Sequence, residues 1–297
     1  MRLTHTLAML AMSCAICSPA IAQDEDREEL KLSAMDALIM APPERALPIA
    51  TRVLQGDGSD ELKERALFIL SQIDLPEAET ALLQVAREGT GDVQEEAIRM
   101  IGISGKAELL GSLKALYASG DEDVKDAVLE AYLIADDVDA VFAIAQQAET
   151  PDEFGNAVEY LGAMGATDRL RELRNRVGME EELIEAYAIA GDVETLMDLA
   201  RDSSRPDMQA EAIEGLAITD LENSQEVFME LYRGSANEDV REAALEALFI
   251  SDNDEALVLL YRESTNNNEK GQLLEYLSTM DSDLVWDLIE AALEEEE

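Results

Sequence analysis

Apolar residues along the chain recur with the period of an α-helix, in segments that repeat about every thirty residues. Clear examples are DVQEEAIRMI at 92–101, DVKDAVLEAY at 123–132 and DVREAALEAL at 239–248. Eight segments align on one small or apolar residue, the anchor: Ala66, Ala97, Val128, Ala157, Leu183, Ala212, Ala244 and Leu273. The intervals between anchors lie between 26 and 32 residues, which indicates an internal repeat.

Each repeat predicts a pair of helices. Positions 0, +1 and +4 from the anchor are apolar in nearly every copy, as at Ala97, Ile98 and Ile101, which marks the buried side of a second helix. A first amphipathic segment precedes it, and turn residues such as 89–91 separate the two. The sequence shows no strand alternation, so we predict an all-α fold.

A single pair of short helices cannot bury its apolar side alone, so neighbouring pairs must stack. We therefore predict an α-solenoid (superhelix) of about eight helical hairpins over residues 44–282. Residues 23–43 are expected to form an N-terminal capping helix, and residues 283–297 a C-terminal capping helix with an acidic tail. The apolar residues expected to close the two ends are Leu30, Leu32, Met35 and Leu38, and Leu284, Val285, Trp286, Leu288 and Ile289.

The N-terminus has the pattern of a secretory signal peptide. Arg2 precedes a largely apolar stretch over 3–16, and small residues at Ala20 and Ala22 predict a signal at 1–22, cleaved before Gln23. The stretch is shorter than the ~20 residues that span a bilayer, so an uncleaved anchor is less favoured. A lipoprotein alternative would use Cys14 or Cys17, without the leucine that usually precedes such a cysteine. Periplasmic or secreted localisation is expected.

Cleavage would remove every histidine and cysteine of the chain, because His5, Cys14 and Cys17 all lie in the signal. This excludes cysteine nucleophiles, Ser-His-Asp triads, imidazole or thiolate zinc sites and disulfides. We therefore predict no enzyme, no catalytic residue, no cofactor and no metal site. An enzyme built on carboxylates is the least favoured hypothesis, since no nucleophile motif or phosphate loop departs from the repeat.

The chain is strongly acidic, with 66 Asp and Glu against 22 Lys and Arg and a formal net charge of −44. A basic surface is needed to bind phosphates, so nucleic acid is not an expected partner. Anionic membranes are disfavoured too, and no membrane insertion is expected after signal cleavage. The acidity fits either adaptation to salt or a cationic partner, and both interpretations stay open.

The phrase Asp-Val-x-x-x-Ala followed by an apolar helix, clearest at 91–105 and 238–251, resembles HEAT-like repeats of the short, roughly thirty-residue type. That type includes the repeats named after phycobilisome lyases. The resemblance covers residues 44–282 and implies a solenoid whose second helices line the concave surface. No residue matches a lyase active site, so no catalytic residue is carried over.

The position two residues after the anchor carries glutamate in six consecutive copies: Glu130, Glu159, Glu185, Glu214, Glu246 and Glu275. This position points about 180° away from the buried stripe. Together with the resemblance, it predicts an acidic concave groove that binds a protein or extended peptide, possibly basic. The alternative is a solvated position that accepts any good helix former.

The preferred function is therefore a non-enzymatic protein-binding scaffold of the bacterial envelope. The second hypothesis is an accessory or regulatory subunit that binds a small cationic ligand or divalent cations along the same groove. Acidic turns at 121–123, 136–137 and 252–254 invite a calcium proposal, but residues 121–126 contain no glycine for the bend of a calcium loop, and no glutamate follows at the twelfth position. We interpret them as helix N-caps, and we expect capping boxes at Asp92 with Glu95 and at Asp239 with Glu242.

Overall fold

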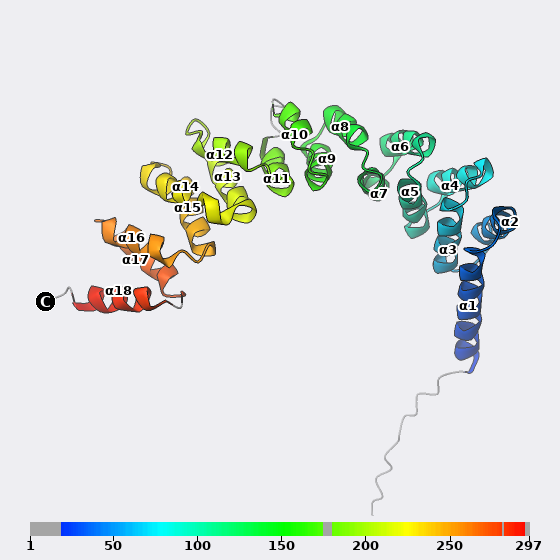
Figure 1. Ribbon diagram of the computed structural model, residues 1–297, viewed down its shortest axis with the longest axis horizontal. Helices are drawn as coiled ribbons and strands as arrows, with labels where there is room; N and C mark the ends of the chain where they lie inside the picture. Colours follow the sequence, from blue (N-terminus) through cyan, green and yellow to red (C-terminus); the bar gives the residue numbers. More distant parts are fainter. Residues whose placement is uncertain (1–18, 175–179, 281, 295–297) are drawn as a thin grey trace, which may run out of the picture. The chain divides into compact units, whose positions relative to one another are not determined.

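The computed structural model describes residues 19–174, 180–280 and 282–294, and within them it contains eighteen α-helices and no strand (Figure 1). Sixteen helices follow one another along the chain in eight pairs, which we call hairpins: α2 (Pro43–Leu54) with α3 (Asp60–Ser71), α4 (Pro76–Glu88) with α5 (Asp92–Ser104), α6 (Ala107–Ser119) with α7 (Glu122–Ile134), α8 (Val138–Gln147) with α9 (Pro151–Ala163), α10 (Thr167–Leu173) with α11 (Glu180–Ala190), α12 (Val193–Arg201) with α13 (Pro206–Thr219), α14 (Leu221–Gly234) with α15 (Glu238–Ile250), and α16 (Asp254–Glu263) with α17 (Asn267–Leu277). Helix α1 (Pro19–Leu38) precedes them and α18 (Asp283–Glu294) follows. The predicted all-α solenoid of helical hairpins is confirmed.

The chain divides into two compact units, the first ending at Leu116 and the second beginning at Tyr117, inside α6. In the first unit, α3 packs against α1, α2, α4 and α5. In the second unit, α7, α9, α11, α13 and α15 pack each against the next. The first helices α8, α10, α12 and α14 form a separate layer on one side of these second helices (Figure 1). In the second unit, α9, α11 and α13 are each covered by their own first helix and flanked by the second helices on both sides.

The predicted core positions are buried in all eight hairpins, except that Leu274, at +1 in the last copy, is only half-buried. Every anchor residue is at most 2% exposed, including Leu183 and Leu273. The residue at +4 is also buried in every copy, as at Leu161 and Leu216. Burying one such leucine contributes about 1.5–3 kcal/mol relative to leaving it in water. The helical period of the sequence thus marks the core correctly.

Side chains in the acidic turns cap helices, as predicted. The side chain of Asp121 accepts a hydrogen bond from the Val124 amide at the start of α7. Asp137 and Asn253 hold the equivalent position at α8 and α16. Each such cap satisfies one of the free amides of a first helical turn. The N-cap interpretation is confirmed for these three residues.

The two predicted capping boxes are wrong. The N-cap of α15 is Asn237, whose side chain accepts from the Val240 amide, and Asp239 already lies in the first turn. There its negative charge favours the positive end of the helix dipole. The N-cap of α5 is Gly91, which has a φ of 56° and no side chain to accept a bond. Several residues near the start of each helix suit an N-cap, and the sequence alone does not identify which of them occupies that position.

Helix α1 attaches to α3 at the N-terminal end. Met35 is buried, Arg65 Nη1 lies 3.0 Å from Asp36 Oδ1, and Ser59 donates a hydrogen bond to Glu28. Leu30 is exposed, so only part of the predicted apolar set is buried. Helix α1 begins at Pro19, and residues 1–18 of the predicted signal lie outside the described residues. Signal cleavage and export therefore stay predictions.

Helix α18 follows the last hairpin and buries Val285 and Leu288. The expectation that Leu284 and Trp286 help to close this end is wrong, because these side chains are 41% and 55% exposed. One residue corresponds to 100° around a helix. The stripe through 285 and 288 therefore leaves both neighbours of Val285 outside the contact with α16.

Candidate functional site

The six predicted glutamates lie on α7, α9, α11, α13, α15 and α17, all in the second unit. Glu159, Glu185, Glu214, Glu246 and Glu275 are exposed, and Glu130 is half-buried. The anchor side of the same helices is buried, so the expected orientation away from the core is confirmed. We call these six residues the glutamate row. Their role in partner binding stays a prediction.

Five members of the glutamate row carry uncompensated negative charge. Within the described part of the chain, its five exposed members form no ion pair with a basic side chain. Several basic residues instead connect neighbouring hairpins. Lys125 Nζ of α7 lies 2.6 Å from Glu153 Oε1 of α9, and Arg169 Nη2 of α10 lies 2.7 Å from Asp139 Oδ1 of α8. These basic side chains therefore pair with carboxylates outside the row.

Two members of the row, Glu159 and Glu185, line a pocket of about 370 Å³ between α9 and α11. Glu122, Asp152 and Glu182 line it too, and no basic residue does. Within residues 19–174, 180–280 and 282–294, however, no three acidic, histidine or cysteine side chains are grouped closely enough to hold a metal ion. The pocket therefore offers diffuse negative charge and no arrangement of metal ligands.

Several carboxylates lie close together beside the row, around Glu211 in α13. Partial burial raises the pKa of the Glu211 carboxyl above its ordinary value. The negative charges of Glu181, Asp207 and Glu214 raise this pKa further, because each disfavours a second anion nearby. An incoming cation would relieve the same repulsion.

Replacing Glu211 by glutamine is expected to raise the unfolding midpoint by about 1–2 °C at neutral pH, on the order of 0.5 kcal/mol. The folded-state pKa is raised, so protonation stabilises the wild-type protein as the pH falls from neutral through that pKa. The advantage of the variant should therefore disappear near about pH 3.5, where folded and unfolded carboxyls are largely protonated. Thermal unfolding followed by circular dichroism at both pH values measures this, and an equal gain at both would contradict the explanation.

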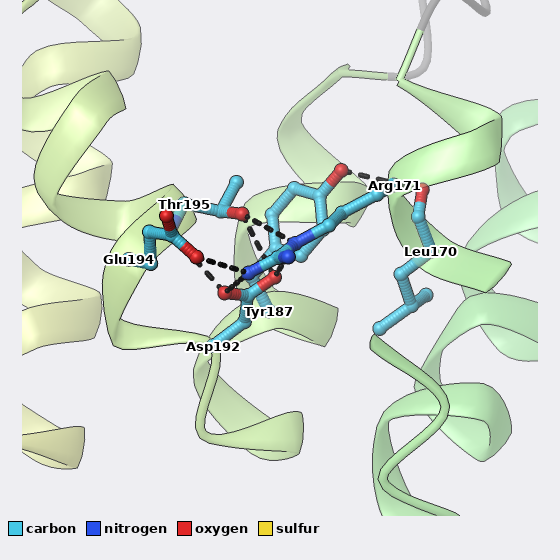
Figure 2. Close-up of polar contacts among 6 residues, drawn as sticks. All are labelled: Leu170, Arg171, Tyr187, Asp192, Glu194 and Thr195. Carbon is cyan, nitrogen blue, oxygen red and sulfur yellow. Dashed lines mark hydrogen bonds and ion pairs between the residues drawn. The ribbon is translucent and has the colours of Figure 1, made fainter. Parts of the chain in front are cut away.

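Sequence reasoning missed a polar network that joins the fifth hairpin to the sixth (Figure 2). Asp192, only 4% exposed, caps α12 and accepts hydrogen bonds from the Thr195 amide at 3.2 Å and the Thr195 hydroxyl at 2.8 Å. Arg171 of α10 donates to both Asp192 oxygens, from Nε at 2.7 Å and from Nη2 at 2.5 Å. Its Nη2 also contacts Glu194 at 3.2 Å. The bidentate pair fixes α10 against α12.

Burial alone would raise the pKa of the Asp192 carboxyl, but the hydrogen bonds from Arg171 and Thr195 outweigh it and hold this pKa below its ordinary value. Beside the pair, the Tyr187 hydroxyl donates to the Leu170 carbonyl oxygen at 3.3 Å. Burial raises the pKa of Tyr187 to about 12, helped by the Asp192 charge. All these groups have partners inside the protein, so the network is a structural connection.

A pocket of about 440 Å³ opens next to this network, between α10, α12 and the start of α13. Arg171, Arg174 and Arg205 line it, which invites an anion site. Arg171 is held by Asp192, however, and Arg205 Nη2 lies 3.6 Å from Glu180 Oε1. Four carboxylates also line the pocket, those of Glu180, Glu194, Asp198 and Asp202. The lining therefore holds more negative than positive groups, and the glutamate row is the stronger candidate for binding.

Residues 47–132 match the family model for HEAT repeats, which covers most of the first three hairpins. The match supports a HEAT-like repeat protein. The finer resemblance to the type named after phycobilisome lyases stays a prediction. The comparison with curated proteins found no match. In the described part of the chain, no helix combines the length and the apolar character needed to cross a membrane.

Proposed function

Starting from HEAT-like repeats over residues 47–132, we propose that this protein is a non-enzymatic protein-binding scaffold of the bacterial envelope. It presents the glutamate row to a basic segment of a protein partner. One observation carries the proposal: an exposed carboxylate without a basic partner recurs on the five successive second helices α9, α11, α13, α15 and α17, whose opposite sides are buried. HEAT repeats are generally protein-interaction scaffolds, which supports this reading.

The charge distribution defines the type of partner. A row of carboxylates attracts cationic side chains over about 8 Å at physiological ionic strength, and it repels anionic surfaces. Each solvent-exposed ion pair contributes only about 0.2–1 kcal/mol. Binding would therefore need contacts with several successive hairpins, which favours an extended or helical segment over a single side chain.

The location belongs to the same proposal. The signal-like segment at 1–22 would direct the chain out of the cytoplasm, and cleavage before Gln23 would release it. A scaffold in the periplasm, or secreted, would then meet the basic segments of other exported proteins.

Changing Glu185, Glu214 and Glu246 together to glutamine is expected to weaken binding of a lysine- and arginine-rich synthetic peptide about tenfold, since three exposed pairs would be lost. The remaining binding should depend less steeply on salt, because fewer charges take part. Fluorescence anisotropy of the labelled peptide at low and at physiological salt measures both quantities.

A matched control changes Glu226, Glu230 and Glu255 to glutamine on the first helices α14 and α16, where all three are exposed. It removes the same net charge from the other layer and should leave the affinity nearly unchanged. If both triple variants weakened binding equally, the row would act only through the net charge of the chain, and the proposal would be wrong. Tight, row-dependent binding of a polyamine with no peptide binding would favour the small-cation alternative, for which the pocket beside Glu159 and Glu185 is suited.

A further inference from the structure

A second feature recurs on the second helices of the second unit, four residues after the glutamate row. Position +6 from the anchor holds isoleucine in four of them, and all four side chains are exposed: Ile134 by 42%, Ile189 by 44%, Ile218 by 82% and Ile250 by 63%. Ala163 and Thr279 hold the equivalent position on α9 and α17. We call the four residues the isoleucine row. Exposed apolar side chains that recur in register indicate a contact surface.

The isoleucine row runs beside the glutamate row. Residues four apart on a helix lie on the same side, about 6 Å apart along the axis. Glu214 and Ile218 form such a pair on α13, and Glu246 and Ile250 form the next on α15. Each of these hairpins therefore presents one carboxylate and one aliphatic side chain at the same two places.

Neighbouring second helices pack against one another, and α11, α13 and α15 carry isoleucine at three consecutive steps, whereas Ala163 of α9 separates Ile134 from them. Ile189 of α11 lies against Gly162 of α9, where an added Cβ would come within 3.1 Å of the isoleucine Cβ. The Thr219 hydroxyl of α13 donates to the Ala188 carbonyl oxygen of α11 at 3.4 Å. With the packing of α13 against α15, these contacts place the two rows side by side on the consecutive helices α11, α13 and α15.

We propose that the glutamate row and the isoleucine row together form a docking surface for a basic amphipathic helix of a partner protein. The inference rests on the proposed function and adds the chemistry of the occupant. The apolar stripe of the partner helix would lie on the isoleucine row, and lysine or arginine residues flanking that stripe would meet the glutamate row.

Spacing favours a helix as the occupant. Packed second helices are spaced about 8–10 Å apart, and residues seven apart on a partner helix are separated by about 10.5 Å. In an extended strand, side chains on one side recur every ~6.6 Å and fall out of register. A helix is also about 10 Å wide, so it can contact both rows at once.

Charge excludes the most obvious competing occupant, a second copy of this chain. The chain has a formal net charge of −44 and five members of the glutamate row have no basic partner, so two copies facing each other would repel. An anionic lipid surface is disfavoured for the same reason. A partner that carries both cations and an apolar stripe satisfies both rows.

The test uses the full chain and labelled peptides of about 20 residues, which span ~30 Å as a helix and so cover about three hairpins. The probe carries leucine at helical spacing with lysine and arginine at the flanks. One control peptide has the same composition in scrambled order, and another replaces each leucine by glutamine. The amphipathic probe is expected to bind about tenfold more tightly than either control, because only it can place apolar side chains on one row and cations on the other.

The protein variants separate the two rows. Ile218→Gln with Ile250→Gln should weaken the amphipathic probe about tenfold and leave the leucine-free basic peptide unchanged. The matched control, Leu259→Gln with Leu284→Gln, removes two exposed apolar side chains from α16 and α18 and should change neither. Circular dichroism of each variant checks that helicity is retained, as exposed positions should allow.

Several outcomes would overturn the inference. One is equal affinity for the amphipathic and scrambled probes, and another is an unchanged affinity of the amphipathic probe for the isoleucine variant. Either result leaves the proposed function intact if binding of the basic peptide still depends on the glutamate row. Failure of every basic peptide to bind would remove both. Isoleucine-dependent association of the chain with itself in sedimentation, or preferred binding of a proline-rich extended peptide, would show that the occupant is wrong.

Discussion

Replacing Asp192 by alanine is expected to lower the free energy of unfolding by about 3 kcal/mol. The change removes the N-cap of α12, worth about 1 kcal/mol. It also removes the bidentate pair with Arg171, whose two charge-assisted bonds share one partly exposed guanidinium and together contribute about 2 kcal/mol. The unfolding midpoint should fall by about 5–10 °C. Thermal and urea unfolding, followed by circular dichroism, measure the loss.

Asp137 provides the matched control. It occupies the equivalent N-cap of α8, with similar backbone angles, and its side chain accepts from the Ala140 amide at 3.1 Å. Asp137→Ala should therefore cost only about 1 kcal/mol, the value of the cap. Equal losses at Asp137 and Asp192 would show that the Arg171 pair adds nothing to stability.

The Asp192 effect should also depend on pH. Its folded-state pKa lies below the ordinary value, so its contribution is present at neutral pH and is lost as the pH falls through the folded pKa. The difference between wild type and Asp192→Ala should narrow steadily below about pH 4. A difference that stays constant down to about pH 2 would contradict the charged pair as its source.

Replacing Gly162 by valine is expected to cost about 2–3 kcal/mol. A Cβ at this position would lie 2.8 Å from the Ala186 carbonyl oxygen of α11, and a backbone atom cannot rotate away. Helices α9 and α11 would have to separate, and forced overpacking typically costs about 1–3 kcal/mol. Ile189 would move with α11, so binding of the amphipathic probe should weaken as well. Unfolding and anisotropy measurements test the two consequences.

Gly155 lies on the same helix and also faces α11, which makes Gly155→Val the matched control. An added Cβ there meets only the Glu182 side chain, with Cγ at 3.2 Å, and this flexible chain can turn aside. Valine also removes the helix penalty of glycine, so the change should stay within about 0.5 kcal/mol of wild type. If both valine variants lost stability equally, close approach of α9 and α11 would not be the cause.

The sequence predicted what is local to one hairpin. Burial at the anchors and exposure of the glutamates follow from the helical period within each copy, so they could be read without knowing how hairpins stack. The link between Arg171 and Asp192 joins positions 21 residues apart and depends on that stacking. The exposed isoleucines lie at a fixed position in the repeat, +6 from the anchor. The predicted pattern of apolar residues covered only positions 0 to +4, so it did not include them.

Helix ends and chain ends were the other limits. Asn237 and Asp239 both suit an N-cap, and only the backbone geometry shows that Asn237 takes the role. Trp286 was predicted to lie on the apolar stripe of the last helix. Its neighbour Val285 is buried, whereas the Trp286 side chain, one residue further along the helix, is exposed. Neighbouring residues of a helix point about 100° apart, and the residue types alone do not determine which of the two faces the core.

The pairing of one carboxylate with one aliphatic side chain per hairpin has a consequence for how such a chain can diverge. Gain or loss of a whole hairpin would lengthen or shorten the docking surface in unit steps and leave the register of the remaining steps unchanged. Reach and selectivity would then vary independently: the number of copies would decide how long a partner is accommodated, and single substitutions within a copy would decide which side chain is accepted at that step.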